Sequence, residues 1–61
     1  MAIFNKVSTY NVTYQKLFAD GAARNDFQTA LNKEGKDGWK PYQTVEINGQ
    51  LLIFFVSEIP D

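Results

Sequence analysis

The feature that most constrains the fold is the dipeptide Asn48-Gly49, which lies between two β-rich runs near the end of the chain. Asn and Gly tolerate the positive φ that both central positions of a type I′ turn require, and this turn is the commonest two-residue link between antiparallel strands. The sequence therefore predicts a closing β-hairpin. A two-residue turn sets these residues opposite each other: Ile47 and Gln50, Val45 and Leu52, Gln43 and Phe54, Tyr42 and Phe55.

The last strand of this hairpin, QLLIFFVS, is apolar on both faces. Strands that are covered on both sides have this pattern, so we place this strand at the centre of a sheet. Its hairpin partner contains Pro41, which has no N–H to donate, so that partner is expected at a sheet edge. Leu52, Phe54 and Val56 lie on one face of the central strand, and Leu51, Ile53 and Phe55 lie on the other.

A further strand is predicted over Lys6 to Tyr14, which is rich in β-branched and aromatic residues. The segment 15–24 is interpreted as a loop that contains an Asp20-Gly21 turn and is anchored by Leu17-Phe18. From Ala22 to Glu34 the apolar residues recur at helical spacing, and the helix has a candidate cap at Asn25 and an earlier competing cap at Asp20. Its apolar stripe consists of Ala23, Phe27, Ala30 and Leu31.

The segment EGKDGWK joins this helix to the hairpin. We interpret Gly35 as the residue whose left-handed conformation ends the helix, and Gly38 as the position of a second sharp bend. Trp39 then turns back as the first core residue of the next strand. This gives the motif a structural role, so its lysines need no bound phosphate to explain them.

Together these elements predict a single domain over 1–61, ordered over about 6–57, of the α+β class. Its architecture is a small βαββ unit with a three-stranded sheet in the order 1-3-2 and one helix packed on one face. The first and second strands run parallel in this topology and are joined by a right-handed helical crossover.

One helix covers only one face of a sheet, so the other face needs a partner. If the helix packs on Trp39, Val45, Ile47, Leu52, Phe54 and Val56, a second apolar patch stays open. We expect two copies to associate through this patch; the alternative is that Met1 to Phe4 or Leu17-Phe18 folds over it. The patch consists of Tyr42, Leu51, Ile53 and Phe55.

Length and composition support self-association and give little support to catalysis. A chain of 61 residues buries little surface, and this one has no cysteine for a disulfide and no histidine. The commonest general base and the strongest side-chain nucleophile are therefore both missing. We expect no enzyme activity, no cofactor and no metal site.

Nucleic-acid binding is disfavoured by the net charge of -1. Gly35-Lys36-Asp37-Gly38 has the spacing of a GXXG loop, but such a loop joins two helices, whereas a strand pattern follows here. Tyr10, Tyr42 and Phe55 could form a stacking platform on the open sheet face. This leaves a small-ligand or single-stranded nucleic-acid binder as the alternative function.

The longest apolar run, Leu51 to Val56, is far shorter than the roughly 20 residues that cross a bilayer. The N-terminal residues lack a basic region followed by a sustained apolar stretch. We therefore expect no membrane span and a cytoplasmic location.

Three parts of the chain match a known sequence pattern: Tyr10-Asn11-Val12, LNKEGKDGW at 31–39 and INGQLLIFFV at 47–56. Through them the chain resembles the small bacterial and phage proteins grouped as the domain of unknown function numbered 4177. The match covers about 10–57, and LNxxGxxGW is its fairly specific part. The long loop at 15–24 and the final VSE depart from the pattern. The resemblance implies a compact, self-associating βαββ domain with no assigned activity.

The function that these observations predict is non-catalytic binding. We expect a homodimer or higher homo-oligomer that acts as a protein-interaction or inhibitor module.

Overall fold

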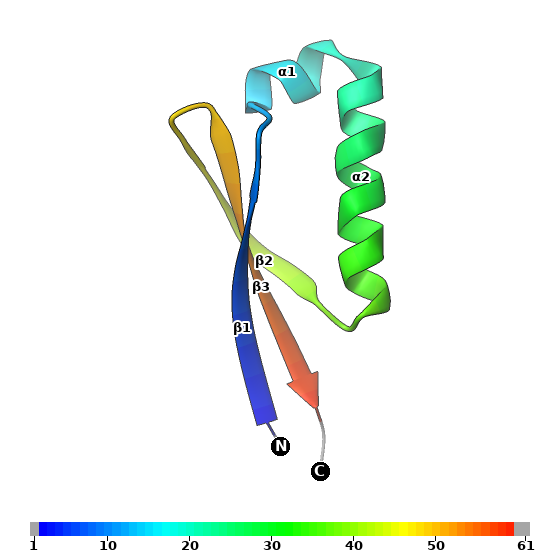
Figure 1. The fold of residues 1–61 in the computed structure, drawn as a ribbon, viewed down its shortest axis with the longest axis vertical. Helices are drawn as coiled ribbons and strands as arrows, with labels where there is room; N and C mark the ends of the chain where they lie inside the picture. The colour runs from blue at the N-terminus through cyan, green and yellow to red at the C-terminus, as the bar shows by residue number, and fades with distance from the viewer. Residues whose placement is uncertain (1, 60–61) are drawn as a thin grey trace.

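The computed structural model describes residues 2–59 and contains five elements (Figure 1). They are β1 (Ala2–Tyr10), α1 (Tyr14–Ala19), α2 (Gly21–Lys36), β2 (Lys40–Ile47) and β3 (Gln50–Ile59). The sheet has the strand order β1-β3-β2, and both outer strands run antiparallel to β3. β1 and β2 are consequently parallel to each other, and the predicted α+β class and strand order are confirmed. A second helix, α1, was not predicted.

The hairpin turn has the predicted geometry, because Asn48 and Gly49 adopt φ angles of 52° and 78°. The register near the turn is also as predicted, with Ile47 opposite Gln50. Farther from the turn, a β-bulge between Pro41 and Gln43 sets Pro41 opposite Phe55. The predicted pairing of Tyr42 with Phe55 is therefore wrong.

The bulge sets on which face of the sheet Trp39 lies relative to the rest of β2. An extra residue in a strand moves every side chain beyond it to the opposite face. Trp39 precedes the bulge and is half-buried on the face of the sheet that α2 covers. Val45 and Ile47 follow the bulge and lie on the uncovered face together with Leu52. The prediction that these residues share the helix face with Trp39 is wrong for this reason.

The core lies between α2 and one face of β3. Leu51, Ile53 and Phe55 are 0%, 1% and 0% exposed, and they are the fully buried large apolar side chains of residues 2–59. These three residues were predicted to form the self-association patch together with Tyr42. The structure corrects that assignment: they form the core, and only Tyr42 of the four is exposed, at 56%.

β1 begins and ends four residues earlier than the predicted strand at Lys6 to Tyr14. Residues 2–4 are part of the sheet, paired with the end of β3, so they do not fold over a sheet face. Met1 lies outside the described residues. The strand ends because Thr13 caps a helix: its hydroxyl accepts the Lys16 N–H at 3.0 Å.

α1 occupies part of the segment that was predicted to be a loop. Arg24 of α2 closes its C-terminal end by donating from Nη1 to the carbonyl oxygens of Leu17 at 2.8 Å and Phe18 at 3.1 Å. Leu17 is half-buried, but Phe18 is 83% exposed. The predicted anchoring role is therefore wrong for Phe18.

α2 begins at the earlier of the two candidate caps. The Asp20 carboxylate accepts the N–H groups of Ala22 at 2.9 Å and Ala23 at 3.4 Å. The predicted apolar stripe is half-buried, and it continues to Glu34 one turn farther on. The opposite side of the helix, which carries Arg24, Gln28, Asn32 and Lys33, is exposed as predicted.

The end of α2 is a Schellman motif that uses Gly38. Trp39 N–H donates to the Glu34 carbonyl at 3.1 Å, and Gly38 N–H donates to the Gly35 carbonyl at 3.0 Å. Gly38 has a φ of 88°, whereas Gly35 is an ordinary helical residue. The prediction that Gly35 takes the left-handed conformation and ends the helix is therefore wrong: Gly38 takes that conformation, two residues beyond the last helical position.

The molecule is elongated for its length. Its Cα radius of gyration is 12.7 Å, against about 10.5 Å expected for a compact domain of this size. The Cα trace spans 43 × 21 × 13 Å, and α2 lies beside the sheet when the molecule is viewed along its shortest dimension (Figure 1). No helix within 2–59 is long and apolar enough to cross a membrane.

Candidate functional site

One face of the sheet has no helix against it. In Figure 1, α2 runs along one side of the strands and α1 lies near the end of β1, while no helix within 2–59 lies on the other side. We call this uncovered side the open face. Its apolar residues come from all three strands: Ile3 and Val7 of β1, Tyr42, Val45 and Ile47 of β2, and Leu52, Phe54 and Val56 of β3.

Large apolar side chains on the open face are exposed to solvent. Ile3 is 57% exposed, Val7 51% and Ile47 49%, whereas the central-strand residues between them are half-buried by their neighbours. The Tyr42 ring lies beside Phe54, with 6.2 Å between ring centroids and planes tilted by 49°. The register also places Lys40 and Glu58 on this face, both near the end of β3 that is remote from the turn. The middle of the face therefore carries no charged residue, and its polar residues are Asn5, Thr9 and Gln43.

The predicted stacking platform is not formed. Tyr10 lies on the helix side, where its ring meets Phe27 edge to face with centroids 5.7 Å apart. Phe55 is buried in the core on the same side. Of the three proposed stacking residues only Tyr42 is on the open face, and few cations accompany it. This arrangement removes the structural basis for binding single-stranded nucleic acid there.

An ion pair closes the core at the C-terminal end of α2. Lys6 of β1 pairs with the Glu34 carboxylate, and the two side chains are 34% and 19% exposed. The Lys6 ammonium lies 4.9 Å from the centre of the Trp39 ring, within range of a cation–π contact. These three side chains connect the sheet, the helix and the segment that follows it. Trp39 lies one residue before β2 and is half-buried, so it is not the first core residue of that strand as predicted, but its ring contacts Lys6 beside the end of α2.

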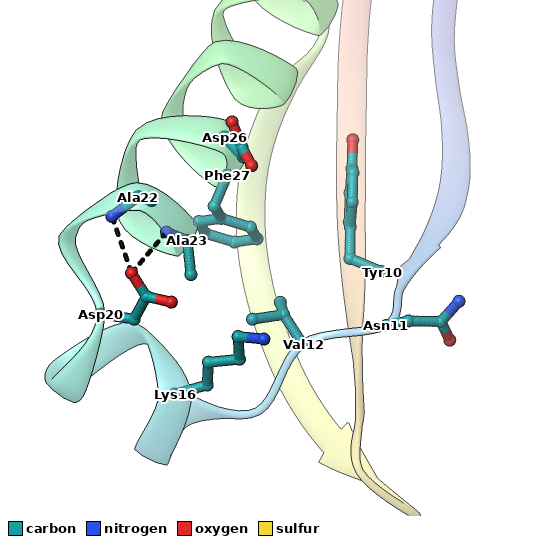
Figure 2. A pocket seen from close by; sticks show the side chains of 9 residues that line it. All are labelled: Tyr10, Asn11, Val12, Lys16, Asp20, Ala22, Ala23, Asp26 and Phe27. Carbon is teal, nitrogen blue, oxygen red and sulfur yellow. Dashed lines mark hydrogen bonds between the residues drawn. The ribbon is translucent and has the colours of Figure 1, made fainter.

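A pocket of about 310 Å³ opens on the helix side, between the end of β1 and the helices α1 and α2 (Figure 2). Its apolar wall includes the Tyr10 and Phe27 rings, and charged groups stand around it. The volume is at the lower end of the range for small-molecule sites. The residues that line it are Tyr10, Asn11, Val12, Lys16, Asp20, Ala22, Ala23, Asp26 and Phe27.

The polar groups of this pocket give no catalytic arrangement. The Asp20 carboxylate is already engaged as the cap of α2. Lys16 and Asp26 are exposed side chains at surface positions. Within 2–59, no three Asp or Glu side chains are grouped closely enough to hold a metal ion. The pocket has the dimensions to accept a small amphipathic molecule.

α1 is attached to the sheet by the hairpin. The Tyr14 N–H donates to Glu46 Oε2 at 2.6 Å, and the Tyr14 hydroxyl donates to the Thr44 carbonyl at 3.3 Å. A carboxylate at a helix N-terminus is favourable because the helix dipole is positive there. Gln50 adds a link near the turn by donating to Asn11 Oδ1 at 2.5 Å.

The sequence-based prediction did not include the apolar residues that β1 contributes to the open face. The signal that could have found them is the alternation of Ile3, Asn5 and Val7, which extends the β pattern toward the N-terminus. Tyr10 and Tyr14 favour a strand, so the predicted strand extends to Tyr14, which the structure places in α1.

The fold and its open face define a small α+β protein with one covered and one uncovered sheet surface. No protein-family model matches the chain, and neither the curated proteins nor the solved structures include a significant match. The resemblance described above therefore remains a prediction.

Proposed function

We propose that this chain is a non-catalytic binding module that associates with a second copy through the open face. The observation that carries the proposal is the exposure of Ile3, Val7 and Ile47 on one continuous sheet surface. Large contiguous apolar surfaces on small proteins mark interaction sites. The chain has a small core of its own, so burial between two copies adds the apolar contact that a single copy lacks.

The size of the open face fits a weak to moderate interface. Three strands spaced about 4.8 Å apart and about 3.3 Å per residue along the ten residues of β3 give a flat area of about 475 Å². Two copies would cover about 950 Å² in projection, and the uneven side-chain surface increases the accessible area further. Specific interfaces begin near a total of about 1,000 Å². Two such sheets would pack about 10 Å apart.

Self-association would leave the outer side of α2 free. This side carries Arg24, Gln28, Asn32 and Lys33, all exposed and polar or charged. We propose it as the surface that contacts another protein, which fits the interaction or inhibitor role expected for a bacterial or phage protein of this kind. Non-obligate interfaces are about as polar as the rest of a protein surface, so this composition suits a reversible contact.

The test is a double variant, Tyr42→Asp with Ile47→Asp. Both side chains are about half exposed in one copy, at 56% and 49%, so the substitutions should leave the single chain folded. In the paired assembly, they would place unpaired carboxylates between two apolar sheets, which is strongly unfavourable. We expect the association constant, measured by analytical ultracentrifugation, to fall by at least about 100-fold, which corresponds to about 2.8 kcal/mol.

The matched control is Gln28→Asp with Asn32→Asp, which adds the same charge to the outer side of α2. This variant should associate like the parent chain. Circular dichroism confirms that both variants are folded. The proposal is wrong if the parent chain sediments as a single copy at high micromolar concentration, or if the open-face variant associates as strongly as the parent.

A further inference from the structure

The two edges of the sheet differ in how open they are to another strand. The β2 edge contains Pro41 and a β-bulge, and both features obstruct pairing with a further strand. The β1 edge is formed by Ala2–Tyr10, which has no proline and pairs without interruption with β3 from Ala2 to Tyr10. Its other side carries a row of backbone donors and acceptors. β1 is therefore the edge that is able to accept a strand.

The side chains of β1 also indicate a contact beyond the open face. Ile3 and Val7 point to the open face, but Phe4 lies opposite Ser57, on the helix side of the sheet. Phe4 is 50% exposed there. Packing of two open faces cannot cover a side chain on the opposite side of the sheet. A partner along the β1 edge would contact side chains on both faces.

We infer that β1 pairs antiparallel with β1 of a second copy, which joins two three-stranded sheets into one continuous sheet. The symmetry axis passes beside Asn5. In this register Ile3 lies opposite Val7 of the second copy on the open face, and Phe4 lies opposite Lys6 of the second copy on the helix side. The two exposed aliphatic side chains cover each other, and each aromatic ring lies beside Lys6 of the second copy, whose ammonium also pairs with Glu34 of its own chain.

The alternative registers are less favourable. Directly opposite residues in an antiparallel pair lie on the same face, so a symmetric pairing must be centred on a residue. Centring on Lys6 would set two lysines opposite each other, which is repulsive. Centring on Val7 would leave Ile3 opposite Asn11, beyond the end of β1. Centring on Asn5 pairs residues 2–8 and includes the three exposed apolar side chains of β1.

A second copy is the partner that we infer for this edge, because in this register Ile3 and Val7 of one β1 lie opposite Val7 and Ile3 of the other. The pairing also satisfies the backbone groups of both edges at once. It is a separate contact from the open-face contact, since the two use perpendicular symmetry axes, although Ile3 and Val7 take part in both. Both contacts together close into an assembly of four chains with two-fold axes, a common symmetry of homo-oligomers.

The first test compares Phe4→Lys with Phe4→Glu. In the inferred register the lysine would face Lys6 of the second copy, and the glutamate would face the same cation favourably. Light scattering should give four chains for the parent and Phe4→Glu, and two chains for Phe4→Lys, which keeps the open-face contact. Since Phe4 is half exposed, both variants should fold, which circular dichroism checks. Equal masses for the two variants would overturn the inference.

The second test is disulfide formation in a chain that has no cysteine of its own. Asn5→Cys should form a disulfide-linked dimer on mild oxidation, because opposite residues in an antiparallel pair have Cα atoms about 4.5–5.5 Å apart, within disulfide range. Thr9→Cys on the same strand is the control and should stay reduced. Asn5→Cys that cross-links no faster than Thr9→Cys would contradict the inferred register.

Failure of the edge contact is distinguishable from failure of the proposed function. The open-face variant, Tyr42→Asp with Ile47→Asp, should give two chains that still cross-link through Asn5→Cys. If that variant retains four chains, the open-face proposal fails and the edge inference stands. If the parent never exceeds two chains and Phe4→Lys leaves them paired, the edge inference fails. A β1 edge that binds only an extended segment of another protein would likewise overturn pairing between copies.

Discussion

The two glycines after α2 differ in their backbone conformation although they stand in one motif. Gly38 has a φ of 88°, and a Cβ built there would meet Ser57 Oγ at an ordinary 3.6 Å. Substitution by alanine is therefore costly because of the backbone angle and not because of crowding. We expect Gly38→Ala to lower the free energy of unfolding by about 1–2 kcal/mol.

Gly35 is the matched control for that prediction. It is helical, and a Cβ added there has no heavy atom of the surrounding structure within 4 Å. Gly35→Ala should raise the free energy of unfolding by about 0.5–1 kcal/mol, since glycine is a poor helix residue. Urea denaturation of the two variants measures both effects. A loss of stability for Gly35→Ala would show that the helix ends before this residue.

Phe54 and Phe55 are adjacent in the sequence but lie on opposite faces of β3. Phe55 is 0% exposed, and truncation of a buried phenylalanine costs about 3–5 kcal/mol. A domain of this length has a total stability of about 3–9 kcal/mol, so we expect Phe55→Ala to be largely unfolded in isolation. Phe54→Ala should stay folded and associate more weakly. Circular dichroism at 25 °C distinguishes them, and equal unfolding of both would contradict the assignment of faces.

At the scale of elements, α1 depends on a contact from a distant strand. Glu46 accepts the Tyr14 N–H at 2.6 Å and places a negative charge at the start of the helix. Glu46→Gln should weaken this attachment by about 1 kcal/mol, because the charge-assisted bond and its interaction with the helix dipole are lost. Hydrogen exchange of the α1 amides should accelerate about fivefold. Glu58→Gln, an exposed carboxylate on β3, should leave this exchange unchanged.

The elements that the sequence located well are those with a local chemical signal. Asn48-Gly49 fixed the hairpin and the register next to it, and the spacing of Phe27, Ala30 and Leu31 fixed the helix. Thr13 as a cap of α1 was missed because the tyrosines around it favour a strand. Local propensity is similar for both states in such a short segment, and contacts from Glu46 and Arg24 decided the outcome.

At the scale of the molecule, the elongated shape and the small core follow from the same arrangement. One long helix covers one side of a three-stranded sheet, and a single copy leaves the open face and the β1 edge exposed. The open face and the β1 edge are both buried in the proposed assembly, whereas the outer side of α2 and the pocket beside Tyr10 remain accessible. Binding to another molecule would therefore take place on the helix side.

The sequence by itself determined the α+β class, the strand order and the existence of an apolar face left without a helix. It could do so because turn chemistry, period and apolar content are local properties of the chain. Only the tertiary structure decided which face that is. Both faces of β3 are apolar, so apolar content does not distinguish them, and the bulge between Pro41 and Gln43 puts Trp39 on the face opposite Val45 and Ile47. A bulge shifts the alternation by one residue, so every side chain before it lies on the opposite face from the one that the alternation predicts, and no local pattern in the sequence marks its position.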